Sequence, residues 1–277
     1  IANQLANRGV NRMGATFACR MQEETNLPAA DIARAFWAAD HIFGAESLWR
    51  AIEALDNRAP ADLQVELMVE IRTLIERACR WLLRNRKNYS GVADAVAQFH
   101  DGAQTLLAAL PDLVPTTLNT RVASRQLAWI EAGVPESLAL TLARLEFVPA
   151  FFDIIELARA SGVELVVAAR TYYALGRELE LDWLSQAVTR LPRDNRWQSL
   201  ARTALRDDLY RLHRELASTA LACPACGADD YASSWLSGRD GALVAVRQTQ
   251  AELKGYGQLD LAMLSAGMRE IANQLMA

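Results

Sequence analysis

Apolar side chains recur every three or four residues along almost the whole chain, a pattern that predicts helices nearly throughout. In residues 61–86 the apolar positions are Leu63, Leu67, Ile71, Leu74, Ala78, Trp81 and Leu82. Charged side chains such as Glu66, Glu70 and Arg77 occupy the opposite face. Because a helix advances 3.6 residues per turn, these two sets fall on opposite sides of one amphipathic helix.

Proline, glycine and polar residues divide the rest of the chain into further helical segments. They are expected at 27–44, 46–55, 90–111, 116–133, 135–162, 163–192, 194–221, about 229–254 and 258–276. Pro111 is expected to end one helix, and Pro149 to kink or break another, since proline lacks the backbone N–H donor. Only 163–167 has strand-like composition, and no second strand is present to pair with it. The pattern predicts an all-α, multi-helix bundle of about ten to twelve mostly antiparallel helices with no sheet.

The chain begins in the middle of a helical pattern rather than before one. Its first residues, "IANQLANRGV", contain apolar and polar positions at helical spacing and no capping residue ahead of them. We therefore expect 1–277 to be one helical domain cut from a larger polypeptide. A candidate sub-boundary lies near 111–116.

Composition narrows the class of protein. Hydrophobic residues make up 52% of the 277 residues and charged residues 22%, the balance of a soluble globular protein. The net charge of −4, with acids and bases mixed along the chain, argues against a nucleic-acid partner. No apolar run approaches the roughly 18 residues of a membrane span. Four cysteines form no disulfide framework, so a cytoplasmic location is expected.

The sequence "CPAC" at 223–226 is the most conspicuous candidate for chemistry. Cys223 and Cys226 have the spacing of two zinc ligands or of a redox dithiol. A structural zinc site needs four ligands, and the nearest further candidate is His213 on a probable helix. A redox pair is expected at the start of a helix that follows a strand, and the sequence predicts no strand here. We therefore expect 223–226 to be a surface turn.

Other candidate sites have simpler structural readings. His41, His100 and His213 lie far apart on separate helices and are expected to be partly exposed polar residues. The sequence "GYGQLD" at 255–260 lacks the third glycine of a dinucleotide loop and is expected to join two helices. Arg193, Arg196, Arg202 and Arg206 could bind an anion, but a salt-bridged helix surface with Trp197 buried is favoured.

Three stretches, in order, resemble one family, the large single-chain bacterial NAD-dependent glutamate dehydrogenases. They are 7–26 with 29–44, then 48–86 ("LWRAIEALDNRAPADLQVELMVEIRTLIERACRWLLRNR"), and 179–217 ("LELDWLSQAVTRLPRDNRWQSLARTALRDDLYRLHRELA"). They look like successive parts of that family's C-terminal helical domain. The resemblance spans nearly the whole chain and is least distinctive after about residue 220.

The resemblance implies a parent enzyme that converts L-glutamate, NAD and water to 2-oxoglutarate, ammonia and NADH. It places the catalytic domain, with its lysine, aspartate and glycine-rich NAD loop, before this chain. This chain has two lysines, Lys87 and Lys254, and no such loop. No catalytic, cofactor-binding or metal-binding residue can therefore be carried over, and NAD is expected only in the parent.

The expected partners are the parent's own catalytic domain and a second copy of the chain. Residues 1–24 are the expected inter-domain surface, with Gly14, Thr16, Phe17 and Arg20 as candidate contacts. The simpler reading is that these four residues pack the first helix. The alternative function is a free-standing helical protein-interaction module, which predicts a contiguous exposed apolar patch. A helical enzyme would instead need convergent titratable groups.

Overall fold

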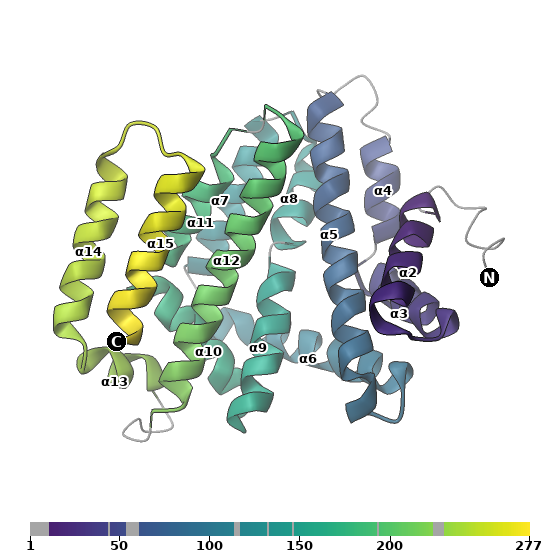
Figure 1. Cartoon of the computed structure of the whole chain (residues 1–277), viewed down its shortest axis with the longest axis horizontal. Helices are drawn as coiled ribbons and strands as arrows, with labels where there is room; N and C mark the ends of the chain where they lie inside the picture. The colour runs from purple at the N-terminus through teal and green to yellow at the C-terminus, as the bar shows by residue number, and fades with distance from the viewer. Residues whose placement is uncertain are drawn as a thin grey trace. The chain divides into compact units, whose positions relative to one another are not determined.

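The computed structural model describes residues 11–43, 45–53, 61–113, 117–131, 133–145, 147–192, 194–223 and 230–277. Across these ranges the regular elements are helices, and no strand is present (Figure 1). The predicted all-α class is confirmed. The α-helices are α2 (Asn11–Thr25), α3 (Ala29–Phe43), α4 (Ala45–Glu53), α5 (Ala61–Asn85), α6 (Val92–Leu113), α7 (Thr117–Glu131), α8 (Glu136–Leu145), α9 (Phe147–Ser161), α10 (Leu165–Glu178), α11 (Leu181–Thr189), α12 (Arg196–Leu221), α13 (Tyr231–Ser237), α14 (Asp240–Gly255) and α15 (Leu261–Met276), and the 3-10 helix η1 spans Arg86–Asn88.

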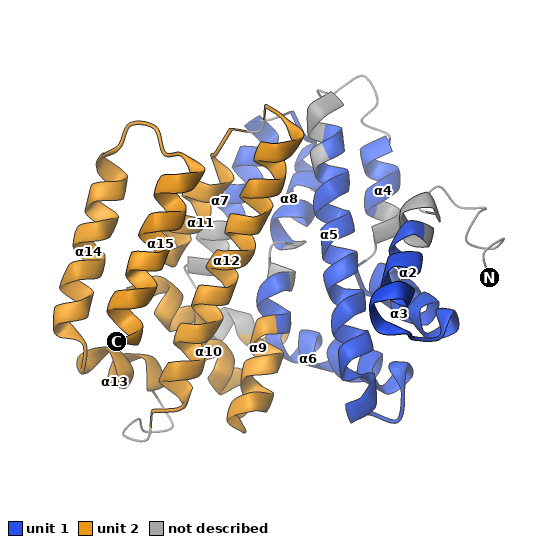
Figure 2. Ribbon diagram, viewed as in Figure 1, with its two compact units in different colours: residues 1–107, 118–152 blue, residues 108–117, 153–277 orange. Residues whose placement is uncertain are grey.

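The chain divides into two compact units (Figure 2). Unit 1 contains residues 1–107 and 118–152, and unit 2 contains residues 108–117 and 153–277. The sub-boundary expected near 111–116 stays a prediction. None of the helices in the described part of the chain combines the length and apolar composition that crossing a bilayer requires.

An aromatic cluster forms the centre of unit 1. Phe99 of α6 stacks on Phe152 of α9 with 4.9 Å between ring centroids, and Trp81 of α5 lies 5.4 Å from Phe99. Phe43 meets both phenylalanines edge to face. Burying each such ring stabilises the fold by about 1.5–3 kcal/mol. The cluster therefore joins helices that are far apart in the sequence.

In unit 2, α12 packs against α10, α11, α13 and α15, and α14 pairs with α15 as a hairpin (Figure 1). The close approach of these last two helices depends on Gly267. A Cβ atom at Gly267 would lie 2.5 Å from Leu253 Cδ1, closer than atoms in contact can come. Leu264 and Ile271 of α15 are fully buried and continue the same apolar face.

Three helix boundaries differ from the sequence-based prediction. A kink or break is expected at Pro149, but α8 ends at Leu145 and α9 begins at Phe147, so Pro149 falls in the first turn of α9. There its missing N–H costs nothing, because first-turn donors have no partner within the helix. Likewise α6 continues through Pro111 to Leu113. The segment predicted at 163–192 is broken at Glu180, whose φ of +49° is left-handed.

Candidate functional site

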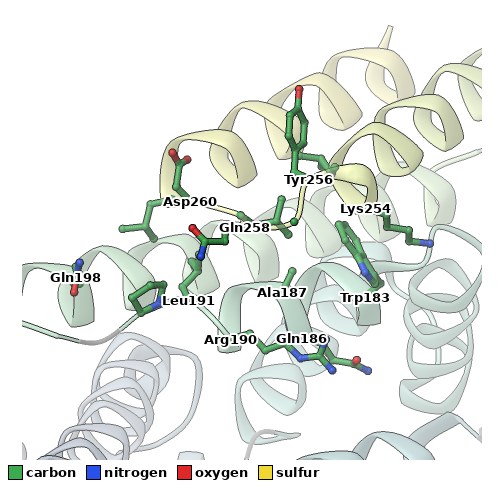
Figure 3. Close-up of a pocket in the computed structure, with 15 residues that line it drawn as sticks. Trp183, Gln186, Ala187, Arg190, Leu191, Gln198, Lys254, Tyr256, Gln258 and Asp260 are labelled. Atoms are coloured by element: carbon green, nitrogen blue, oxygen red, sulfur yellow. The ribbon is translucent and has the colours of Figure 1, made fainter.

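A groove of about 740 Å³ lies in unit 2, between α11 and the loop that joins α14 to α15 (Figure 3). Its volume falls in the range of small-molecule sites. Side chains of α11 form one wall, the loop 256–260 forms the opposite wall, and Gln198 of α12 contributes at one end. The loop is the "GYGQLD" sequence, which does join two helices as predicted.

The α11 wall follows directly from helical spacing. Trp183, Ala187 and Arg190 are four and three residues apart, so they line one face, and Gln186 and Leu191 lie beside them. Ala187 and Leu191 are buried, whereas Arg190 is exposed. The groove therefore has an apolar floor, an indole at one position and a guanidinium at another.

Contacts from α14 fix the start of α11. The buried amide of Gln250 donates from Nε2 to the Leu179 carbonyl oxygen at 2.5 Å. Lys254 pairs with the carboxylate of Glu180, and its Nζ lies 5.3 Å from the centroid of the Trp183 ring. Because Glu180 is left-handed without being glycine, these contacts hold a turn that is unfavourable by itself.

The polar groups around the groove differ in what they already bind. Lys254 is paired with Glu180, and Asp260 accepts a 2.7 Å hydrogen bond from the Met263 backbone N–H as the N-cap of α15. By contrast, no acidic group among the described residues pairs with Arg190. The Oε1 atom of Gln198 is buried and accepts no hydrogen bond from any described group. Among the charged and buried polar groups of the groove, Arg190 and the Oε1 atom of Gln198 therefore have no partner within the described structure.

Metal-binding groups do not gather at this groove or elsewhere in the described ranges. No three histidine, cysteine, aspartate or glutamate side chains there are arranged to hold a metal ion. Cys223 lies two residues after the end of α12 and is half-buried. Residues 224–229, which include Cys226, lie outside the described residues, so the expected surface turn stays a prediction.

The four residues proposed as inter-domain contacts all lie on α2. Phe17 is buried, with 1% of its surface exposed, and Arg20 is partly exposed. Thr16 is exposed, and for Gly14 the structure describes the backbone within the helix. The contact with another domain is untested.

Arg20 and Phe17 both contact side chains of α5 within unit 1. Arg20 Nη2 donates to Glu76 Oε2 at 2.8 Å, and Arg72 Nε donates to Glu76 Oε1 at 2.9 Å. The guanidinium carbons of Arg20 and Arg80 lie 5.6 and 5.4 Å from the centroid of the Phe17 ring. These contacts fix α2 on α5, as the simpler reading of the sequence expected.

Comparison with known proteins assigns the family. Residues 1–273 match the family described as "Glutamate dehydrogenase, C-terminal". The chain belongs to this family. It is 34% identical over 273 residues to the NAD-specific glutamate dehydrogenase of Pseudomonas aeruginosa, and 32% identical over 273 residues to that of Mycobacterium tuberculosis. The protein of the same name from Halomonas elongata is 31% identical over 275 residues.

The matches cover nearly all of this chain but a small part of each relative. They include 98% of the chain for the Pseudomonas and Mycobacterium proteins and 99% for the Halomonas protein. In each case they span 17% of the relative's length. The predicted relationship to NAD-dependent glutamate dehydrogenases is therefore confirmed at the level of the C-terminal region.

The histidines of this glutamate dehydrogenase C-terminal region are on three helices, as predicted. His41 and His100 are exposed, and His100 Nδ1 lies 3.8 Å from Asp101 Oδ1. The expectation of partial exposure is wrong for His213, which is buried. Its imidazole stacks on Tyr172 with 3.6 Å between ring centroids, and Gly176 provides the space for it.

The arginine-rich start of α12 also departs from expectation. Trp197 is 79% exposed rather than buried, since it lies at the second position of the helix and points away from the unit's core. Arg202 is buried instead, and its Nη1 donates to the Thr189 carbonyl oxygen at 3.3 Å. Arg193 lies outside the described residues. Arg202 therefore has a structural role in joining α12 to the end of α11.

Sequence reasoning did not find the groove. Its wall residue Trp183 and its loop residue Gln258 come from segments far apart in the chain, and neither segment carries a known ligand motif. The one available signal was the spacing of Trp183, Ala187 and Arg190, which places an aromatic and a cation on one helix face.

Proposed function

We propose that this chain is the C-terminal helical domain of an NAD-specific glutamate dehydrogenase and supplies none of its catalytic groups. The full-length enzyme would convert L-glutamate, NAD and water to 2-oxoglutarate, ammonia and NADH in the cytoplasm. The match over residues 1–273 and the 17% share of each relative's length support this assignment. NAD would bind in the part of the enzyme that this chain does not contain.

The observation that carries the non-catalytic role is that three reactive side chains of the described residues, His213, Lys254 and Cys79, serve structural contacts. His213 Nε2 lies 2.6 Å from the Tyr172 carbonyl oxygen in a buried stack. Lys254 pairs with Glu180. Burial raises the pKa of the Cys79 thiol to about 12, which keeps it protonated and unreactive. General bases and nucleophiles need access to a substrate, and the buried His213 and Cys79 side chains lack it.

The domain's role would be to pack against the rest of the enzyme and support its assembly or regulation. Helix α2 remains the proposed contact. Phe17 and Met21 on the inner face of α2 are buried in unit 1, while Thr16 and Cys19 are exposed on the outer face. A partner domain would therefore meet the outer face and the exposed part of Arg20.

No exposed large apolar residue among the described positions lies on α2. The exposed apolar side chains occur instead as separate pairs on several helices, among them Val65 with Val69, Leu127 with Ile130, and Trp197 with Leu200. A free-standing interaction module would be expected to gather them into one patch. A domain cut from a larger enzyme would gather them around residues 1–24 instead, so this distribution supports neither reading over the other.

The experiment uses the full-length enzyme with a protease site inserted next to residue 1 of this chain. Glutamate-dependent formation of NADH is measured before cleavage, after cleavage, and for the isolated 277-residue chain. We expect the isolated chain to be inactive and the two cleaved pieces to elute together from a sizing column. Turnover by the isolated chain would overturn the non-catalytic assignment. Immediate separation of the pieces with full activity upstream would favour the independent module.

A further inference from the structure

We infer that the groove between α11 and the α14–α15 loop binds a small aromatic carboxylate. Two features define this ligand: a cation without an acidic partner among the described residues, and an aromatic and apolar wall. This inference does not depend on the proposed enzyme role. It concerns binding by the 277-residue chain alone.

Arg190 selects the anion. Its guanidinium lies at the exposed end of α11 on the groove face and has no acidic partner among the residues that the structure describes. A guanidinium presents its N–H donors in a planar fork that matches a carboxylate in two parallel hydrogen bonds. Lys254, the other cation of the groove, is occupied by Glu180. A ligand therefore needs only one carboxylate, which pairs with Arg190.

The α11 wall selects the body of the ligand. Trp183 lies two helical turns before Arg190 on the same face, and Ala187 lies between them. The distance along the helix between Trp183 and Arg190 is about 10 Å at 1.5 Å per residue, which a substituted benzene ring with its carboxylate nearly spans. A flat apolar ring placed over Ala187 would contact the indole and leave its carboxylate at Arg190.

Gln198 lies beyond the reach of this ligand. Its Oε1 atom is buried at the end of the groove formed by Pro192 and α12, at the opposite end from Trp183 (Figure 3). A ring that contacts Trp183 with its carboxylate at Arg190 directs its far substituent toward Trp183 and away from Gln198, so the ligand needs no donor for this oxygen. Asp260, on the loop side, already accepts the Met263 N–H and disfavours a second anion there.

The test is a titration of the isotope-labelled 277-residue chain with three related probes, followed by NMR of the tryptophan indole N–H signals. The probes are 4-hydroxybenzoate, its neutral isostere 4-hydroxybenzamide, and benzoate, which lacks the hydroxyl group. We expect 4-hydroxybenzoate to bind with a Kd of about 1 mM, a typical strength for a ligand of this size. It should shift the Trp183 signal, assigned with the Trp183→Phe variant, and leave that of Trp37 in place.

The isosteres and variants separate the two features. 4-Hydroxybenzamide should bind at least about tenfold more weakly than 4-hydroxybenzoate, and benzoate should bind within about twofold of it. Arg190→Gln should cause the same loss as the benzamide, whereas Arg247→Gln, an exposed arginine on α14 outside the groove, should have no effect. No shift up to about 20 mM probe would overturn the inference. Equal binding of 4-hydroxybenzoate and 4-hydroxybenzamide to the wild-type chain would also overturn it, whether or not the variants fold.

Discussion

The imidazole of His213 donates a hydrogen bond from Nε2 to the carbonyl oxygen of Tyr172, 2.6 Å away, while its ring stacks on the ring of the same residue. Because a carbonyl oxygen can only accept, Nε2 must carry the proton. The pair joins α10 to α12 in the centre of unit 2. This arrangement requires that nothing larger than hydrogen project from Gly176, one turn after Tyr172.

Substituting Gly176 with alanine should therefore destabilise the fold. The new methyl group would lie 2.8 Å from His213 Cε1, and the imidazole cannot move without losing its hydrogen bond and stack. We expect the free energy of unfolding to fall by about 1–3 kcal/mol, as in other overpacked cores. Urea denaturation followed by circular dichroism measures this change in the free energy of unfolding.

Gly241→Ala is the matched control for that substitution. Gly241 is also a helical glycine, on α14, but nothing lies within 4 Å of a Cβ atom placed there. Alanine should raise stability at this site by about 0.5–1 kcal/mol through its better helix propensity. If both variants gained stability equally, the close packing of His213 on Gly176 would be wrong.

A second prediction concerns the turn that begins α11. Gln250→Leu removes the amide that donates to the Leu179 carbonyl oxygen and should lower the free energy of unfolding by about 1–2 kcal/mol. Gln248→Leu, an exposed change on the same helix, should alter it by less than about 0.5 kcal/mol. Chemical denaturation of both variants under one condition provides the comparison. Equal stabilities would show that the Gln250 amide does not support the turn.

The Glu76 cluster should contribute measurably to the attachment of α2. The Glu76 carboxylate is only 12% exposed and receives hydrogen bonds from Arg20 and Arg72, so Glu76→Gln leaves both guanidinium groups with a weaker partner. A loss of about 1–2 kcal/mol in unfolding free energy is expected. Glu24→Gln, which removes an exposed carboxylate 3.8 Å from Arg20 Nε, should cost less than about 0.5 kcal/mol. A comparable loss in both variants would contradict a special role for Glu76.

Local periodicity was sufficient to locate the helices, because the apolar residues of each buried helix face recur every three or four residues within one short segment. Leu67, Ile71 and Ala78 lie on the buried side of α5 as their spacing predicted. Features that depend on contacts between distant segments were missed. The burial of His213 depends on Gly176 of another helix, and the break at Glu180 depends on Gln250 and Lys254 of α14.

The candidate site was missed for the same reason. Trp183 and Arg190 come from α11, whereas Gln258 comes from a loop more than two helices later. No single segment contains enough of the groove to suggest a ligand. For α2, the simple packing reading of Phe17 and Arg20 agrees with their contacts to Arg80 and Glu76 of α5.

The cysteines should differ sharply in reactivity. Cys19 is exposed, while Cys79 is fully buried with its Sγ 4.0 Å from the Ile32 carbonyl oxygen. With iodoacetamide at pH 8, mass spectrometry should show rapid modification of Cys19 and modification of Cys79 only on unfolding. Rapid labelling of Cys79 in the folded chain would contradict its burial.

The same burial predicts a loss of stability at alkaline pH. Burial raises the pKa of the Cys79 thiol from its ordinary value of 9.0 to about 12, with nearby Arg80 opposing the rise. The folded state therefore holds this proton more tightly than the unfolded state, so its contribution is complete below pH 9 and disappears as pH approaches 12. Above about pH 9.5, the wild-type chain should lose about 1.4 kcal/mol per pH unit more than Cys79→Ala. Parallel stability curves for the two proteins between pH 8 and about pH 10.5 would contradict the buried, protonated thiol.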